Sequence, residues 1–101
     1  MRYTLTEHAK EDLIEIWNYS AERWGESQAD QYLRTLERGF ERIAKGELIS
    51  KRPLPHFETV RSARCEHHYV FFLSSSPIII LAVLHEKMDF ISRLKNRLSD
   101  D

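Results

Sequence analysis

The chain has 101 residues, of which 42% are hydrophobic and 31% are charged, and this composition is ordinary for one small globular domain. Its 15 basic and 16 acidic residues leave a net charge of −1, which argues against a strongly basic DNA-binding protein. The sequence has one cysteine, no signal-peptide core and no apolar run of about 20 residues, so it predicts a cytoplasmic protein with one domain over residues 1–101.

The N-terminal part of the chain is predicted to form a short strand followed by a helix. Residues 2–5 alternate polar and apolar side chains, as a half-buried strand does. Thr6 is placed to cap the helix, and Gly25 is placed to end it. One apolar stripe runs along this helix and contains Ala9, Leu13, Ile16, Trp17 and Trp24. The carboxylates of the helix are expected to form a solvated face and not a catalytic pair; they are Glu11, Asp12, Glu15 and Glu22.

A second helix is predicted between Ser27 and Gly46. Ser27 and Asp30 have the spacing of a capping box at its start. Its apolar residues recur at helical spacing and are Ala29, Tyr32, Leu33, Leu36, Phe40 and Ile43. Because few residues separate the two helices, we expect an antiparallel hairpin, and its two apolar stripes need a sheet to cover.

The second half of the chain is predicted to supply most of that sheet. Segments rich in aromatic and β-branched residues lie at 57–63, 67–73 and 78–84. The last of these is a continuous aliphatic run, which indicates a central strand buried on both faces. Residues 88–98 fit a short helix. The sequence therefore predicts an α+β fold in the order β-α-α-β-β-β-α, with a helical hairpin packed on a small, mainly antiparallel sheet and a short C-terminal helix.

Four stretches of the sequence resemble one superfamily of toxins. They are YTLTEHAKEDLIEIWNY at residues 3–19, QADQYLRTL at 28–36, HHYVFFL at 67–73 and VLHEKMD at 83–89. The last stretch is similar to the leucine-histidine-x-x-methionine-aspartate ending of the RelE/ParE superfamily, and the order of all four resembles its ParE branch. The resemblance implies the toxin component of a type II toxin–antitoxin system. ParE-like toxins poison DNA gyrase, whereas RelE-like relatives cut messenger RNA on the ribosome.

The residue types available for chemistry bear on the choice between these two activities. Cutting RNA without a metal needs a proton acceptor, a proton donor and cations for the phosphate. RelE-like enzymes resemble this scheme with a tyrosine or histidine close to the C-terminus, but no Tyr or His follows Asp89. The candidates that remain for RNA cleavage are Arg61, Arg64, and His85 or His67. This departure favours a protein that binds gyrase, is not an enzyme and needs no cofactor.

The histidines are predicted to have structural roles. His85 can hold the end of the aliphatic strand to the following turn, and Asp89 can cap the last helix or hold the imidazole. Met88 can fill an irregular gap beside the sheet. His67 and His68 are adjacent on a strand, so they point to opposite faces and are not expected to form a metal site.

Two surfaces are predicted to bind other proteins. The gyrase-binding surface is expected in the basic second half and comprises Arg61, Arg64, Arg93, Lys95 and Arg97. The antitoxin-binding surface is expected around the helical hairpin and comprises Trp17, Tyr19, Trp24, Tyr32 and Leu36. The resemblance implies a hetero-oligomer with a ParD-like antitoxin, which has a ribbon–helix–helix DNA-binding half and a segment that folds on binding. The toxin alone is then not expected to bind specific DNA. A further alternative is a non-toxic homologue that only binds the antitoxin.

Overall fold

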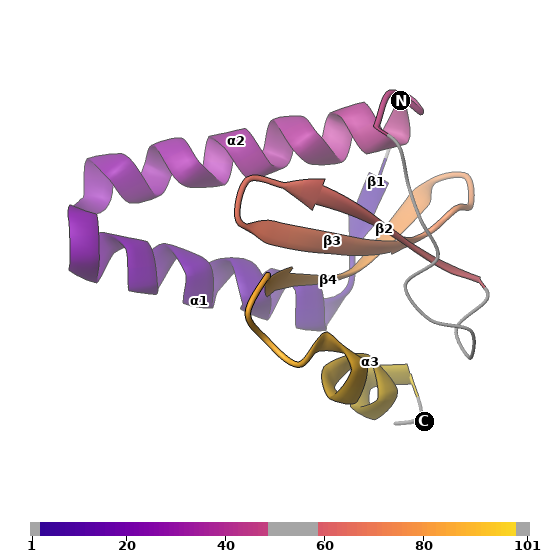
Figure 1. Cartoon of the computed structure of the whole chain (residues 1–101). Coiled ribbons are helices and arrows are strands. Elements are labelled where there is room, and N and C mark those ends of the chain that lie inside the picture. Colours follow the sequence, from indigo (N-terminus) through magenta and orange to yellow (C-terminus); the bar gives the residue numbers. More distant parts are fainter. Residues whose placement is uncertain (1–2, 49–58, 99–101) are drawn as a thin grey trace.

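The computed structural model describes residues 3–48 and 59–98, which form three helices and one sheet (Figure 1). In chain order the elements are β1 (Tyr3–Leu5), α1 (Glu7–Trp24), α2 (Glu26–Ala44), β2 (Val60–Cys65), β3 (His68–Leu73), β4 (Ile78–His85) and α3 (Phe90–Leu98). The predicted order and the α+β class are confirmed. Of the strand predicted at 57–63, residues 57 and 58 lie outside the described ranges. No helix within those ranges is long and apolar enough to cross a membrane.

The sheet is mainly antiparallel, as predicted, and has the strand order β1-β4-β3-β2. Only β1 and β4 pair in parallel; β3 is antiparallel to both β4 and β2. The aliphatic strand β4 therefore has a neighbour on each side, which its sequence predicts. Its pairing with β3 is interrupted, because Phe71 pairs with Ala82 and Phe72 with Ile80. Leu81 is left in a bulge without a partner in β3.

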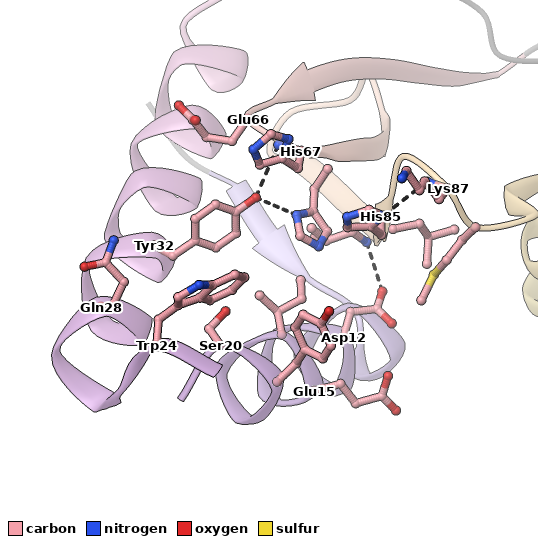
Figure 2. A pocket seen from close by; sticks show the side chains of 16 residues that line it. Asp12, Glu15, Ser20, Trp24, Gln28, Tyr32, Glu66, His67, His85 and Lys87 are labelled. Carbon is pink, nitrogen blue, oxygen red and sulfur yellow. Dashed lines mark hydrogen bonds between the residues drawn. The ribbon is translucent and has the colours of Figure 1, made fainter. Parts of the chain in front are cut away.

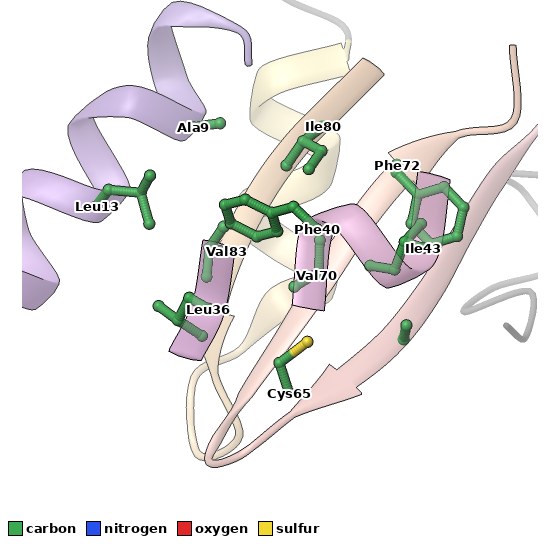
Figure 3. Close-up of a cluster of buried hydrophobic side chains, with 11 residues drawn as sticks. Ala9, Leu13, Leu36, Phe40, Ile43, Cys65, Val70, Phe72, Ile80 and Val83 are labelled. Carbon is green, nitrogen blue, oxygen red and sulfur yellow. The ribbon is translucent and has the colours of Figure 1, made fainter. Parts of the chain in front are cut away.

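Alternate strand residues enter two hydrophobic clusters, one on each face of the sheet. The α1–α2 hairpin covers the first face, where Phe40 and Leu36 are almost completely buried (Figure 3). On the second face, Leu94 of α3 is fully buried in a cluster with Phe71 and Leu84. The buried residues of the first cluster are Ala9, Leu13, Leu36, Phe40, Ile43, Ala63, Cys65, Val70, Phe72, Ile80 and Val83.

The starts of the two long helices differ in their capping. The hydroxyl of Thr6 accepts the N–H of Ala9 at 3.1 Å, so the predicted cap of α1 is confirmed. The predicted capping box of Ser27 and Asp30 is wrong, because α2 begins directly after Gly25 and has no side-chain cap. Gly25 has φ 95°, which a glycine adopts without steric cost, and this single residue joins the two helices.

A second glycine lets α2 approach β2 closely. A Cβ added to Gly39 would lie well inside van der Waals distance of Sγ of Cys65 and 3.5 Å from its Cβ. A glycine in a helix interior costs about 1 kcal/mol relative to alanine, so its use here reflects this packing. Burial raises the pKa of the Cys65 thiol, which is therefore not an activated nucleophile.

Replacement of Gly39 by alanine is expected to lower the free energy of unfolding by about 1–3 kcal/mol, because the overlap with Cys65 outweighs the better helix propensity of alanine. In the double variant Gly39→Ala/Cys65→Ala the sulfur is gone, so most of this loss should be recovered. Urea denaturation of the four proteins in this double-mutant cycle measures the coupling. If Gly39→Ala were as stable as the parent, Cys65 would have to move aside freely.

Candidate interaction site

A groove with a volume of about 720 Å³ opens between the helical hairpin and the end of the sheet where β4 leaves the core (Figure 2). Its walls come from α1, the start of α2, the turn between β2 and β3, and the turn after β4. The apolar part of the lining consists of Ile16, Tyr19, Trp24, Tyr32, Val83, Leu84 and Met88. Such a mixture of aromatic and aliphatic side chains with a few polar groups is typical of a binding site.

Two aromatic side chains on α1 are unusually exposed beside this groove. Tyr19 is 54% exposed and Trp24 is 62% exposed, and their rings form an edge-to-face pair at 6.2 Å. The guanidinium of Arg23 lies over the Tyr19 ring at 5.0 Å from its centroid. Large apolar groups clustered on a surface commonly mark a protein-binding site.

Two other residues predicted for the antitoxin surface have structural roles instead. The indole N–H of Trp17 donates to Asp30 Oδ1 at 2.8 Å, which ties α1 to α2, and Trp17 does not line the groove. Leu36 is fully buried in the first cluster, so its inclusion in an exposed surface is corrected. Both lie on apolar helix stripes, and stripe position alone does not distinguish a core residue from a surface residue.

The polar end of the groove is organised around the hydroxyl of Tyr32. This oxygen lies 2.7 Å from Nδ1 of His68 and accepts the backbone N–H of His67 at 3.3 Å (Figure 2). Burial, reinforced by repulsion from His85 and His67, lowers the pKa of His68 from 6.5 to about 4. His68 is therefore neutral at pH 7, and since the Tyr32 oxygen accepts the His67 N–H, its hydroxyl is left to donate a hydrogen bond to Nδ1 of His68. As predicted from their adjacency, His68 is buried while His67 is exposed.

The residues of the histidine motif fasten β4 to α3. Nδ1 of His85 accepts the N–H of Lys87 at 3.1 Å, and its carbonyl accepts the N–H of Met88 at 2.9 Å. Met88 packs against the cluster on the second face of the sheet. Asp89 caps the helix start, since its carboxylate accepts both the N–H and the hydroxyl of Ser92, at 3.3 and 3.0 Å. Among the hydrogen bonds of the described residues, none joins Asp89 to the imidazole of His85.

The fixed charges of the groove are mainly negative. Asp12, Glu15 and Glu66 line it together with one ammonium group, that of Lys87. Beside it, Glu86 forms an ion pair with Arg64 and lies 3.4 Å from Nδ1 of His67. Desolvation acts to raise the pKa of the Glu86 carboxyl, but these two partners lower it overall. Among the described residues, no group of three or more His, Cys, Asp or Glu side chains is arranged to hold a metal ion.

The five cations predicted for the gyrase surface do not converge on one site. Arg61 and Arg64 lie within β2, and their positions three residues apart place them on opposite faces of the sheet. Arg93 and Lys95 are exposed on α3. The assignment of Arg97 to the exposed surface is corrected, because its side chain is only 15% exposed and is paired with a carboxylate of α1.

That carboxylate belongs to Asp12, which the sequence analysis wrongly placed on a solvated face. Asp12 is 6% exposed, accepts the N–H of Val83 at 2.9 Å and receives two hydrogen bonds from Arg97, at 2.6 and 2.8 Å. The overlooked signal is its position, three residues after Ala9 and four before Ile16, on the apolar stripe itself. Other groove residues without a distinctive pattern in the sequence are Ser20, Gln28 and Glu66.

A model of one protein family matches most of this chain. Its description is the ParE toxin of the type II toxin–antitoxin system parDE, and it matches residues 3–90. The chain belongs to the ParE toxin family. It is thus the toxin component of a type II toxin–antitoxin system, in which a toxin is partnered by an antitoxin.

Individual relatives agree with this family. Toxin ParE of Escherichia coli is 44% identical over 98 residues, which span 95% of this chain and 95% of that protein. Toxin ParE1 of Caulobacter vibrioides is 34% identical over 87 residues, spanning 86% of this chain and 91% of that protein. A chain from a structure described as the chromosomal ParDE system from P. aeruginosa superposes with a TM-score of 0.70, covering 84% of this chain and 95% of that one. Its 19% identity makes this a likeness of fold.

The stability of the protein is expected to depend on pH through His68. Its pKa is about 4 in the folded protein and 6.5 ordinarily, so the unfolded chain binds more protons between these values. The contribution of neutral His68 to the free energy of unfolding is therefore fully present above pH 6.5 and is lost as the pH falls toward 4. His68→Gln should remove this part of the pH dependence, at most about 3 kcal/mol.

Urea denaturation at several pH values measures this effect, and His67→Gln is the matched control because His67 is the exposed neighbour. The His67 variant should keep most of the pH dependence of the parent, because burial is the largest cause of the lowered pKa of His68 and repulsion from His67 is a smaller one. An unchanged dependence in His68→Gln would contradict the assignment.

Proposed function

We propose that this toxin inhibits DNA gyrase by binding it in the bacterial cytoplasm, without chemistry of its own, and that a ParD-like antitoxin neutralises it. The observation that carries the proposal is the separation of the charged groups that a nuclease would have to bring together. The groove contains the histidines but none of the arginines, and the exposed cations Arg93 and Lys95 lie on α3. Membership of the ParE family supports the same function.

The geometry weighs against an RNA endonuclease of the RelE type. A cleavage site needs cations at the phosphate and a free acid or base beside it. In the groove, Nδ1 of His85 and Nδ1 of His68 are already engaged in hydrogen bonds. The carboxylates of Glu15 and Glu66 would repel a phosphate, and Arg64 is paired with Glu86 outside the lining.

The groove is suited to the antitoxin. We assign it to an apolar segment that folds on binding and carries a basic side chain opposite Glu15 or Glu66. Full desolvation of a large apolar side chain stabilises a complex by about 1.5–3 kcal/mol, and Tyr19 and Trp24 are both available for it. The cost of ordering the segment reduces this gain. The rest of the antitoxin would be its ribbon–helix–helix DNA-binding half.

Trp24→Ala is expected to weaken antitoxin binding about 10- to 100-fold, as the loss of a central aromatic side chain from an interface does. Its effect on the stability of the free toxin should be small, because Trp24 is mostly exposed. Titration calorimetry and thermal denaturation measure the two quantities. Ile14→Ala is the matched control, since Ile14 is 61% exposed on the same helix but does not line the groove. Equal binding by Trp24→Ala and the parent would sink this assignment.

A supercoiling assay with purified gyrase tests the target. The parent toxin should inhibit supercoiling or trap a cleaved DNA complex, and added antitoxin should reverse this effect. The variant Arg93→Glu/Lys95→Glu should inhibit at least about tenfold less, because charge reversal opposes a complementary partner surface. Arg34→Glu/Arg38→Glu, which reverses two exposed charges on α2, is the control for net charge.

The alternatives give different results in the same set of experiments. Without inhibition and without a cleaved complex, gyrase is not the target. Cleavage of messenger RNA in a translating extract would then indicate the RelE-like activity. Full survival of bacteria that express the toxin alone would indicate a homologue that only binds antitoxin.

A further inference from the structure

The C-terminal helix α3 is joined to the rest of the molecule by a buried ion pair. Nη2 of Arg97 donates to Oδ1 of Asp12 at 2.6 Å, and Nη1 donates to Oδ2 at 2.8 Å. The two side chains are 15% and 8% exposed. This bidentate arrangement fixes both the distance and the orientation of α3 relative to α1, which a single contact does not.

The bulge in β4 completes the site around Arg97. Leu81 has no partner in β3, and its carbonyl accepts Nη1 of Arg97 at 3.1 Å and the hydroxyl of Thr6 at 3.3 Å. Asp12 in turn accepts the N–H of Val83 from the same strand. Arg97 therefore contacts α1 and β4 at once, and both the carbonyl of Leu81 and the buried carboxylate of Asp12 have hydrogen-bond donors.

Apolar side chains make further contacts between α3 and the sheet. The helix has nine residues, a length that is marginal for an isolated helix. Leu94 is its buried side chain among those described, and Leu98 is partly buried in the same cluster. Apolar contacts hold a helix against a sheet but are not directional, so they allow rotation and sliding.

We infer that Arg97 is a positioning residue, which acts through Asp12 and Leu81 to hold α3 in the one orientation that presents Arg93 and Lys95 to the target. Arg93 lies one turn before Arg97, so rotation of the helix would move both exposed cations. This inference rests on the proposed function for the target of α3. It assigns Arg97 no contact with that target.

Removal of one partner alone would leave a buried charge unpaired and is expected to destabilise the whole fold. The informative variant is therefore Asp12→Asn/Arg97→Met, in which both charges are absent. The asparagine oxygen can still accept the N–H of Val83, and methionine occupies much of the volume of arginine. Arg97→Lys keeps the charge but not the two-pronged geometry, and it serves as the conservative variant.

Hydrogen exchange and gyrase inhibition should respond together in the double variant. Amides of residues 94–98 should exchange about tenfold faster, whereas those of β3 and β4 should be unchanged. Gyrase inhibition should require about tenfold more toxin, because only the fraction of molecules with α3 in its proper orientation is competent to bind. Arg97→Lys should give intermediate exchange and intermediate inhibition.

Arg93→Met is the matched control because it removes an exposed arginine from the same helix. Its gyrase inhibition should fall while the exchange of residues 94–98 stays at the parent level. The inference is overturned if exchange in α3 is unchanged in Asp12→Asn/Arg97→Met, or if α3 loosens while inhibition is retained.

Failure of the parent toxin to inhibit gyrase would contradict the proposed function and not the positioning role. Hydrogen exchange in the double variant and in Arg93→Met would still test whether Arg97 holds α3. Killing of bacteria that express each variant would then replace gyrase inhibition as the measured activity.

Discussion

The arrangement of helices and sheet depends on the hydrogen bonds that the buried carboxylate of Asp12 accepts. This carboxylate joins α1 to β4 through Val83 and to α3 through Arg97, and all three elements meet at one nearly inaccessible group. A buried carboxylate without partners would be strongly destabilising, so the three elements have to assemble in mutual register around it. The same contact fixes the start of α1 on the sheet. The exposed aromatics Tyr19 and Trp24, about two and three turns further along α1, are thereby held over the groove.

At the polar end of the groove, hydrogen bonds between polar groups also hold separate elements together. The hydroxyl of Tyr32 connects α2 with the turn between β2 and β3, and it does so through a histidine that burial keeps neutral. The rings of His68 and His85 pack edge to face at 5.2 Å, and the end of β4 is thereby tied into the same network. A cluster of histidines and a tyrosine in a groove resembles a catalytic site in composition. Here Nδ1 of His68 and Nδ1 of His85 make hydrogen bonds that hold helix, turn and strand together.

Sequence analysis predicted the features that depend on local pattern. Three such patterns each identified a helix or a strand: the periodicity of Ala9 and Leu13, the cap at Thr6 and the aliphatic run of β4. They could be recognised because the repeats of helices and strands involve residues close together in the sequence. The features it missed depend on residues far apart in the chain. Asp12 has the charge of a surface residue, and its contacts with Val83 and Arg97, 71 and 85 residues away, explain its burial. The bulge at Leu81 and the strand order likewise arise from pairing, which no single segment records.

Of the residues predicted for the antitoxin surface, some are exposed in the structure and others are buried. Tyr19 and Trp24 are exposed on α1, whereas Leu36, on the apolar stripe of α2, is completely covered. The two helices differ because the core side chains of α2, Leu36, Phe40 and Ile43, lie over the sheet, while the end of α1 extends beyond it beside the groove. Stripe position therefore predicts which way a residue faces, and the extent of the sheet decides whether anything covers it.

The two proposed binding surfaces are contiguous, and this bears on how a toxin of this shape is neutralised. Met88 lines the groove and also packs in the cluster that holds Leu94 and Leu98 of α3. An antitoxin segment that fills the groove and continues past Met88 would reach α3 within a few residues. Occlusion of α3, the helix proposed to bind the target, then needs no rearrangement of the toxin, only a partner long enough to cross that boundary. A toxin held rigid by Asp12 and Arg97 favours this mode, because a segment that folds on binding gains more from a fixed surface than from one that must itself be ordered.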